Sequence, residues 1–110
     1  MKEICFLGSS LSDLKRFPRN VMHDAGYQLA QLQAGATPAD FKSLAAVASG
    51  VWELRIHDGD SGTFRVVYVS KLRDAIYVLH AFHKKTLKTS PQDVALVRQR
   101  YQQLIQEFSS

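Results

Sequence analysis

The chain has 110 residues, of which 45% are hydrophobic and 22% charged, and its formal net charge at pH 7 is +4. These values are typical of a globular domain long enough to bury a core, and they exclude a largely disordered chain. No apolar stretch approaches the roughly 20 residues that a membrane span requires. The single cysteine, Cys5, has no partner for an internal disulfide or a metal cluster. We therefore expect one domain over residues 1–110, located in the cytoplasm, without a cofactor or metal and without a membrane partner.

The N-terminal half predicts a short strand followed by two helices. Residues 3–7 are mostly apolar and have the length of a strand. Ser10, with an acidic residue three positions later, predicts the N-cap of a short helix. Pro18 ends that helix and can open the next one at its first turn. Apolar residues then recur every three or four positions, which predicts a helix over residues 18–34. Residues 36–50 are small or polar and predict a connection.

The apolar period then changes from about four to two, which predicts β-strands. Three such runs, separated by short turns, cover residues 51–57, 63–69 and 75–83. Neighbouring strands joined by short turns pair in the antiparallel direction. Ser-Pro at residues 90–91 then predicts a capped C-terminal helix, with an apolar stripe that runs to Phe108. The predicted fold class is α+β, an antiparallel sheet with the N-terminal helices and the C-terminal helix packed on one face.

A turn over residues 58–62 would set the register of the first two of these strands. It places His57 opposite Thr63 and therefore Arg55 directly opposite Arg65, with their Cβ atoms about 5 Å apart. Two guanidinium charges at that distance repel by about 1 kcal/mol in bulk-like solvent. A bound anion would reverse this cost, because a guanidinium group recognises phosphate through its planar fork of donors.

Two interpretations of this arginine pair remain open. Glu53 lies on the same face of the predicted sheet and can complete a solvated ion-pair network with the arginines. The other interpretation is a phosphate-binding site. The segment HAFHKKTLKTSP, residues 80–91, favours the second interpretation. It brings two histidines and three lysines, with no acid among them, to the end of the strand next to Arg65.

Read together, these motifs resemble those of the RelE/HigB-like toxins, specifically the phage-derived branch of that superfamily. The resemblance rests on GVWELRI, GTFRVVYV and AIYVLHAFHKKTLKTSPQDVALVRQRY, and it extends from about residue 3 to residue 108. It implies a RelE-like fold and a toxin that cleaves mRNA, commonly on the ribosome. It also implies a cognate antitoxin, of helix-turn-helix type in this branch, that holds the toxin inactive. In this reaction the RNA 2′-hydroxyl attacks the adjacent phosphate without a metal, and the enzyme positions the phosphate and moves protons.

The resemblance further implies roles for individual basic residues. Arg65 matches the family's strand arginine, which stabilises the transition state. Lys84 and Lys85 match its paired lysines, which contact phosphate or transfer a proton. His83 stands where this branch often has glutamine, and we expect either an acid–base role or a surface position for it. The remaining expected RNA contacts are Arg55, Lys88, Arg98 and Arg100. For the last two, a solvated position on the helix without RNA contact is the alternative.

Two other functions stay open. A toxin of the same fold can inhibit DNA gyrase, as in the ParE relatives, and would lack the basic catalytic residues on the sheet. A phage-encoded binding protein without catalysis is the third possibility. The presence of Arg65 and of the paired lysines favours an mRNA endoribonuclease.

Overall fold

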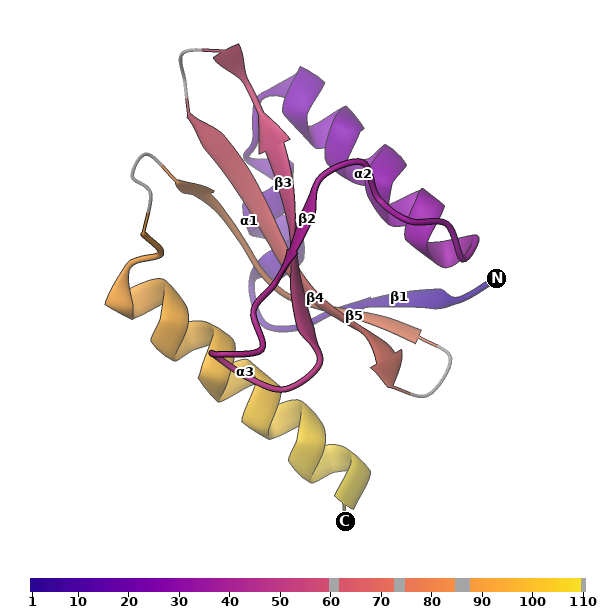
Figure 1. Cartoon of the computed structure of the whole chain (residues 1–110), viewed down its shortest axis with the longest axis vertical. Helices are drawn as coiled ribbons and strands as arrows, with labels where there is room; N and C mark the ends of the chain where they lie inside the picture. Colours follow the sequence, from indigo (N-terminus) through magenta and orange to yellow (C-terminus); the bar gives the residue numbers. More distant parts are fainter. Residues whose placement is uncertain (60–61, 73–74, 85–87, 110) are drawn as a thin grey trace.

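The computed structural model of the chain describes residues 1–59, 62–72, 75–84 and 88–109. In chain order, its elements are β1 (Glu3–Phe6), α1 (Ser10–Lys15), α2 (Arg19–Gln33), β2 (Phe41–Ser43), β3 (Val51–His57), β4 (Thr63–Leu72), β5 (Ala75–Lys84) and α3 (Pro91–Ser109). They form an α+β fold with a single sheet, which confirms the predicted class (Figure 1). None of the helices in these ranges is long and apolar enough to cross a membrane.

The sheet has five strands in the order β1-β5-β4-β3-β2. The pairs from β2 to β5 are antiparallel, whereas β1 runs parallel to β5. The sheet is therefore mixed, which corrects the prediction of an antiparallel sheet. The short turns predicted antiparallel pairing only for the three strands that follow one another closely in the sequence. Strand β1 is distant from β5 in the sequence, so no turn length predicted the direction in which the two pair. Strand β2 lies inside the predicted connection, where three residues are too few to display an alternating pattern.

The predicted register of β3 and β4 is confirmed. Arg55 lies opposite Arg65, and His57 lies opposite Thr63. The apolar residues of the opposite parity pair with one another, as in Leu54 with Val66, and they are buried under α1 and α2. The length of the predicted turn thus gave the correct register, and the apolar pairs stabilise it, because a slip by one residue would turn all of these side chains away from the helices.

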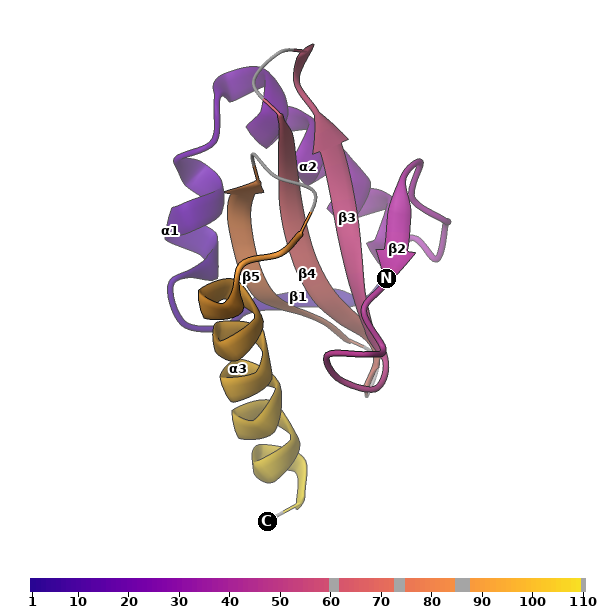
Figure 2. The same ribbon diagram turned by 60° about the vertical axis from the view of Figure 1, so that its left-hand side comes forward.

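The helices cover both faces of the sheet, which corrects the prediction that all three lie on one. Helices α1 and α2 pack on one face, and α3 packs on the other (Figure 2). The second face carries its own buried apolar strip, which includes Val51, Val67 and Leu79 and requires a cover. We call the face on which α3 packs the α3 face. Helix α3 covers only part of it, and the end of β3 and the start of β4 extend beyond the helix (Figure 2). Arg55 and Arg65 lie in this part of the two strands.

A serine side chain forms a hydrogen bond at the start of α1 and another does so at the start of α3. Ser90 caps α3 as predicted, since its Oγ accepts a hydrogen bond from the Asp93 backbone N–H at 3.1 Å. Ser10, the predicted cap of α1, is instead its first residue. The Ser10 side chain is buried, and its Oγ donates to the backbone oxygen of Val78 at 3.2 Å. This bond joins the start of α1 to β5.

Candidate functional site

A buried ion pair joins β3 and β4 on the α3 face. Arg65 Nη1 donates to Glu53 Oε1, and the two residues are 7% and 1% exposed. Burying two charges costs several kcal/mol per ion before their attraction repays it. In the described part of the chain, Arg65 Nε and Glu53 Oε2 have no hydrogen-bond partner. The pair thus keeps one donor and one acceptor that are available to another group.

The opposite arginine has a carboxylate of its own. Arg55 Nε and Nη2 donate to Asp40 Oδ1 at 3.0 and 2.9 Å, and His57 Nε2 lies 2.7 Å from Asp40 Oδ2. Partial desolvation raises the pKa of Asp40, but the hydrogen bonds from His57 and Arg55 and their charges outweigh it. The pKa of Asp40 therefore lies below its ordinary value. These bonds support the ion-pair interpretation of the arginines, with the difference that the pair made by Arg65 is buried rather than solvated.

Lys84 completes a basic group on this face. It lies opposite Thr63 on β4, is 7% exposed, and its Nζ donates to Thr89 Oγ1 at 3.3 Å. Burial lowers the pKa of Lys84, the positive charge of Arg65 lowers it further, and Glu53 acts in the opposite direction. Two further cations, on β2 and β3, contribute to the lowering. We call Lys84 and the three cations that lower its pKa the basic cluster: Lys42, Arg55, Arg65 and Lys84.

His83 lies on the other face of the sheet from the basic cluster. His83 is exposed and stacks on Phe64, with ring centroids 4.2 Å apart and planes inclined by 10°. Because Phe64 belongs to the core under α1 and α2, His83 projects from the opposite face to its neighbour Lys84. The structure thus places His83 in the surface position, one of the two expectations for it, and its acid–base role stays a prediction. The predicted Lys85 lies outside the described residues, and Lys88 is exposed.

The two arginines of α3 differ from each other. Arg98 is exposed, and its Nε donates to the backbone oxygen of Val47 at 3.3 Å. Arg100 is 9% exposed, and its Nη1 and Nη2 donate to the Leu79 backbone oxygen at 2.8 Å and to Ser9 Oγ at 3.1 Å. The Arg100 guanidinium thus joins α3, β5 and the start of α1, which favours a structural role for Arg100 over the expected RNA contact.

Sequence reasoning missed two members of this face. Asp40 and Lys42 lie on either side of the first residue of β2, in the segment predicted as a connection. Neither the ion pair of Asp40 with Arg55 nor the pairing of Lys42 with Glu53 has a local signal, because both depend on β2 joining the sheet edge. In the described ranges, no group of three or more histidine, cysteine, aspartate or glutamate side chains is arranged to hold a metal ion.

His80 is held in a structural setting at the start of α3. Its Nε2 lies 2.7 Å from Asp93 Oδ1, and Ser90 Oγ donates to Asp93 Oδ2 at 2.7 Å. The ring also stacks on Phe82, with centroids 4.6 Å apart. The start of α3 therefore holds the His80 ring in one orientation. Its Nδ1 is buried and has no hydrogen-bond partner among the described residues.

The sequence matches one protein-family model, described as "Phage derived protein Gp49-like (DUF891)", over residues 12–102. No curated protein matches the chain. The matched range runs from α1 into α3 and contains the whole basic cluster together with Glu53 and Asp40.

Proposed function

Because the chain belongs to the Gp49-like family of phage-derived proteins, which is part of the RelE/ParE-like toxin superfamily, we propose that it is the toxin of a toxin–antitoxin pair that cleaves mRNA as an endoribonuclease. The observation that carries this proposal is the buried Lys84 amine beside Arg65 on the α3 face, where burial and cationic neighbours lower its pKa. An amine with a lowered pKa and a guanidinium beside it supply the proton acceptor and the phosphate ligand that RNA cleavage requires.

The proposed reaction uses the RNA's own nucleophile. The 2′-oxygen attacks the adjacent phosphorus, the bond from phosphorus to the 5′-oxygen breaks, and the products carry a 2′,3′-cyclic phosphate and a 5′-hydroxyl. Neutral Lys84 accepts the proton of the 2′-hydroxyl, and water supplies the proton that the departing 5′-oxygen takes up to become the 5′-hydroxyl. Arg65 holds the non-bridging oxygens, whose negative charge grows in the transition state. Its Nε donor has no partner among the described residues, so it can bind phosphate while Nη1 stays on Glu53.

The site is closed in the free protein. Arg65 and Lys84 are each 7% exposed, so RNA binding requires these side chains to become accessible. The exposed cations of the same region, Lys42, Lys88 and Arg98, attract the RNA backbone without burial. We propose that the mRNA is cut on the ribosome, where additional contacts compensate for the cost of opening the site.

The proposed partner is a cognate antitoxin of helix-turn-helix type. The basic cluster holds four cations against the two carboxylates Asp40 and Glu53. An acidic segment of a partner is therefore attracted to this face and competes there with RNA.

One observation favours a second function, that of a binding protein without catalysis. Arg65 is already paired with Glu53 and Arg55 with Asp40, so neither guanidinium is held solely for phosphate. In this alternative the cluster recognises acidic side chains of a protein partner.

Induced expression followed by mapping of RNA 5′ ends tests the proposal. The expected result is growth arrest with new mRNA ends that carry 5′-hydroxyl groups. Intact mRNA together with damaged or relaxed DNA would instead favour a gyrase inhibitor. Intact RNA and DNA with normal growth would favour the binding protein.

A further inference from the structure

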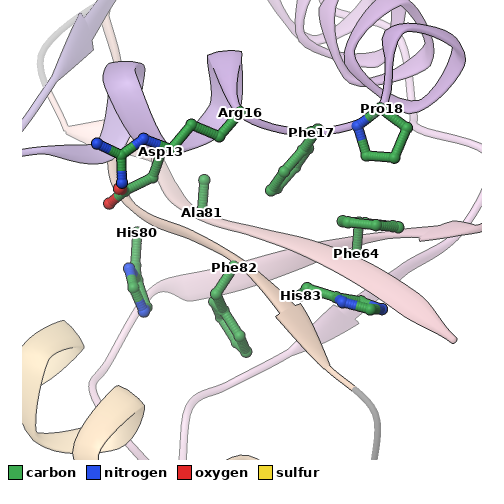
Figure 3. A pocket seen from close by; sticks show the side chains of 9 residues that line it. All are labelled: Asp13, Arg16, Phe17, Pro18, Phe64, His80, Ala81, Phe82 and His83. Carbon is green, nitrogen blue, oxygen red and sulfur yellow. The ribbon is translucent and has the colours of Figure 1, made fainter. Parts of the chain in front are cut away.

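A cavity of about 600 Å³ lies at the edge of β5, next to the basic cluster but separate from it (Figure 3). This size is within the usual range of small-molecule sites. Its apolar walls are mostly aromatic rings: Phe17, Phe64, Phe82 and His83. None of these residues belongs to the basic cluster, and the proposed cleavage chemistry uses none of them.

The sheet topology creates this opening. Strand β1 pairs with β5 only from Ala75 to Val78. Beyond that point, the described residues provide no strand on the outer side of β5, and α1 lies beside it. Side chains from both faces of β5 therefore reach one cavity around the strand edge, His80 and Phe82 from the α3 face and His83 from the other.

The rings provide flat apolar surfaces for a planar ligand. Phe64 and His83 stack almost in parallel, and Phe17 is tilted against Phe64 at a centroid distance of 4.8 Å. His83 is exposed, so one end of this stack is accessible to solvent. Nucleobases stack on aromatic side chains in this manner, and the stacking depends little on the base.

Polar groups at the other end can distinguish between bases. Asp13 of α1 and Arg16, the residue that follows α1, line this end of the cavity (Figure 3), and Asp13 Oδ2 already accepts a hydrogen bond from Ser9 Oγ at 2.7 Å. A carboxylate accepts hydrogen bonds from the N1–H and N2–H groups of guanine, and a guanidinium donates to guanine O6 and N7. Adenine offers a carboxylate only its exocyclic amine and has no oxygen in place of O6. Asp13 and Arg16 together therefore fit guanine best.

The His80 ring is part of the lining. Its Nε2 is held by Asp93, while Nδ1 is buried without a partner among the described residues. In the tautomer whose Nε2–H donates to Asp93 Oδ1, the unprotonated Nδ1 is an acceptor for a base N–H. A ligand with N–H donors would satisfy an atom that is otherwise costly to bury.

The cavity is next to the residue that we propose holds the phosphate. Phe82, in the cavity wall, lies directly opposite Arg65 on β4. Neighbouring strands are about 4.8 Å apart, which is within the reach of one nucleotide. We propose that the cavity binds a guanine base of the RNA, next to the phosphate held by the basic cluster. This inference rests on the proposed function and adds a base preference to it.

Nuclear magnetic resonance of the full-length protein with labelled histidines tests the base site. The probes are guanosine 5′-monophosphate, adenosine 5′-monophosphate and ribose 5-phosphate. The guanine nucleotide is expected to shift the ring signals of His80 and His83, the adenine nucleotide to bind at least about fivefold more weakly, and ribose 5-phosphate to leave both signals unchanged. Arg16→Gln should weaken guanine binding by about five- to a hundredfold. Arg19→Gln, an exposed control on α2, should not.

The outcomes separate this inference from the proposed function. RNA cleavage by a protein whose histidine signals no nucleotide shifts would overturn the base site and leave the nuclease intact. Guanine-specific shifts in a protein that never cleaves RNA would support the base site and contradict the nuclease. Equal shifts by ribose 5-phosphate would overturn the base site, because they indicate phosphate binding alone. Signals that only the antitoxin shifts would also overturn it, since the cavity would then be a protein-docking site.

Discussion

Glu53 and Arg65 form a buried ion pair that joins β3 to β4 at the centre of the basic cluster. Glu53→Gln keeps the shape of the side chain but leaves the buried guanidinium without its counter-charge. Breaking a buried pair in this way typically costs about 3–5 kcal/mol, so we expect a loss of this size in the free energy of unfolding. Denaturant titration measures it. An unchanged midpoint would mean that Arg65 is solvated and not paired with Glu53.

Asp40 competes with RNA for Arg55. Asp40→Asn removes one negative charge from the α3 face and weakens the hold on Arg55 and His57. We expect tighter binding of a non-cleavable 2′-deoxy oligonucleotide and a steeper salt dependence, by about one unit of slope. Filter binding at several salt concentrations measures both. Asp24→Asn, on the exposed side of α2, is the matched control and should change neither. Weaker binding by Asp40→Asn would show that Asp40 orders Arg55 for RNA.

Lys84 should give cleavage a characteristic pH dependence. Its pKa is lowered, so the fraction of neutral amine, and with it the rate, increases as the pH rises through that lowered value. Lys84→Arg stays protonated and should be slow at every pH. Stability follows the same direction, because burial disfavours the charged amine. The cost of this charge is present at neutral pH and is relieved as the pH rises through the folded pKa toward 10.5. A rate in Lys84→Arg that matches wild type would remove Lys84 from the proton transfer.

Arg100 is predicted to act on stability and not on RNA. Arg100→Lys keeps the charge but loses the fork that reaches both the Leu79 backbone oxygen and Ser9 Oγ. Hydrogen bonds to a charged group contribute about 1.5–3 kcal/mol, so we expect the unfolding free energy to fall by about 2 kcal/mol. Cleavage per folded molecule should stay at the wild-type level. A stable variant with weakened RNA binding would restore the role that the sequence suggested for Arg100.

Local patterns were sufficient to predict several features of this protein. Apolar alternation and cross-strand pairing predicted that Arg55 faces Arg65, and the Ser90 cap predicted the start of α3. The side assigned to α3 was wrong, because Val67 and Leu79 form a second apolar strip with the opposite parity. An amphipathic pattern shows that a helix has an apolar side that packs against the rest of the protein, but it does not show which face of the sheet that side packs against.

The carboxylates of the site could not be predicted in the same way. Asp40 reaches Arg55 only because β2 joins the edge of the sheet. Glu53 was recognised as a neighbour of Arg65, but its burial depends on tertiary packing, which leaves no periodic signal in the sequence. That burial also changes the choice of variant. Arg65→Ala would leave the fold intact if Arg65 were solvated, whereas the structure predicts destabilisation because Glu53 would remain buried and unpaired.

RNA cleavage by Arg65→Lys tests the central claim most directly, because lysine keeps the charge opposite Glu53 and removes only the planar fork. The measurement compares the rates at which purified wild type and variant produce 5′-hydroxyl RNA ends, with melting curves to establish that both are folded. If Arg65 holds the transition state, wild type should cleave and the folded variant should be slower by about 10²-fold or more. A folded Arg65→Lys that cleaves at nearly the wild-type rate would contradict this account, since Arg65 would then supply only diffuse positive charge.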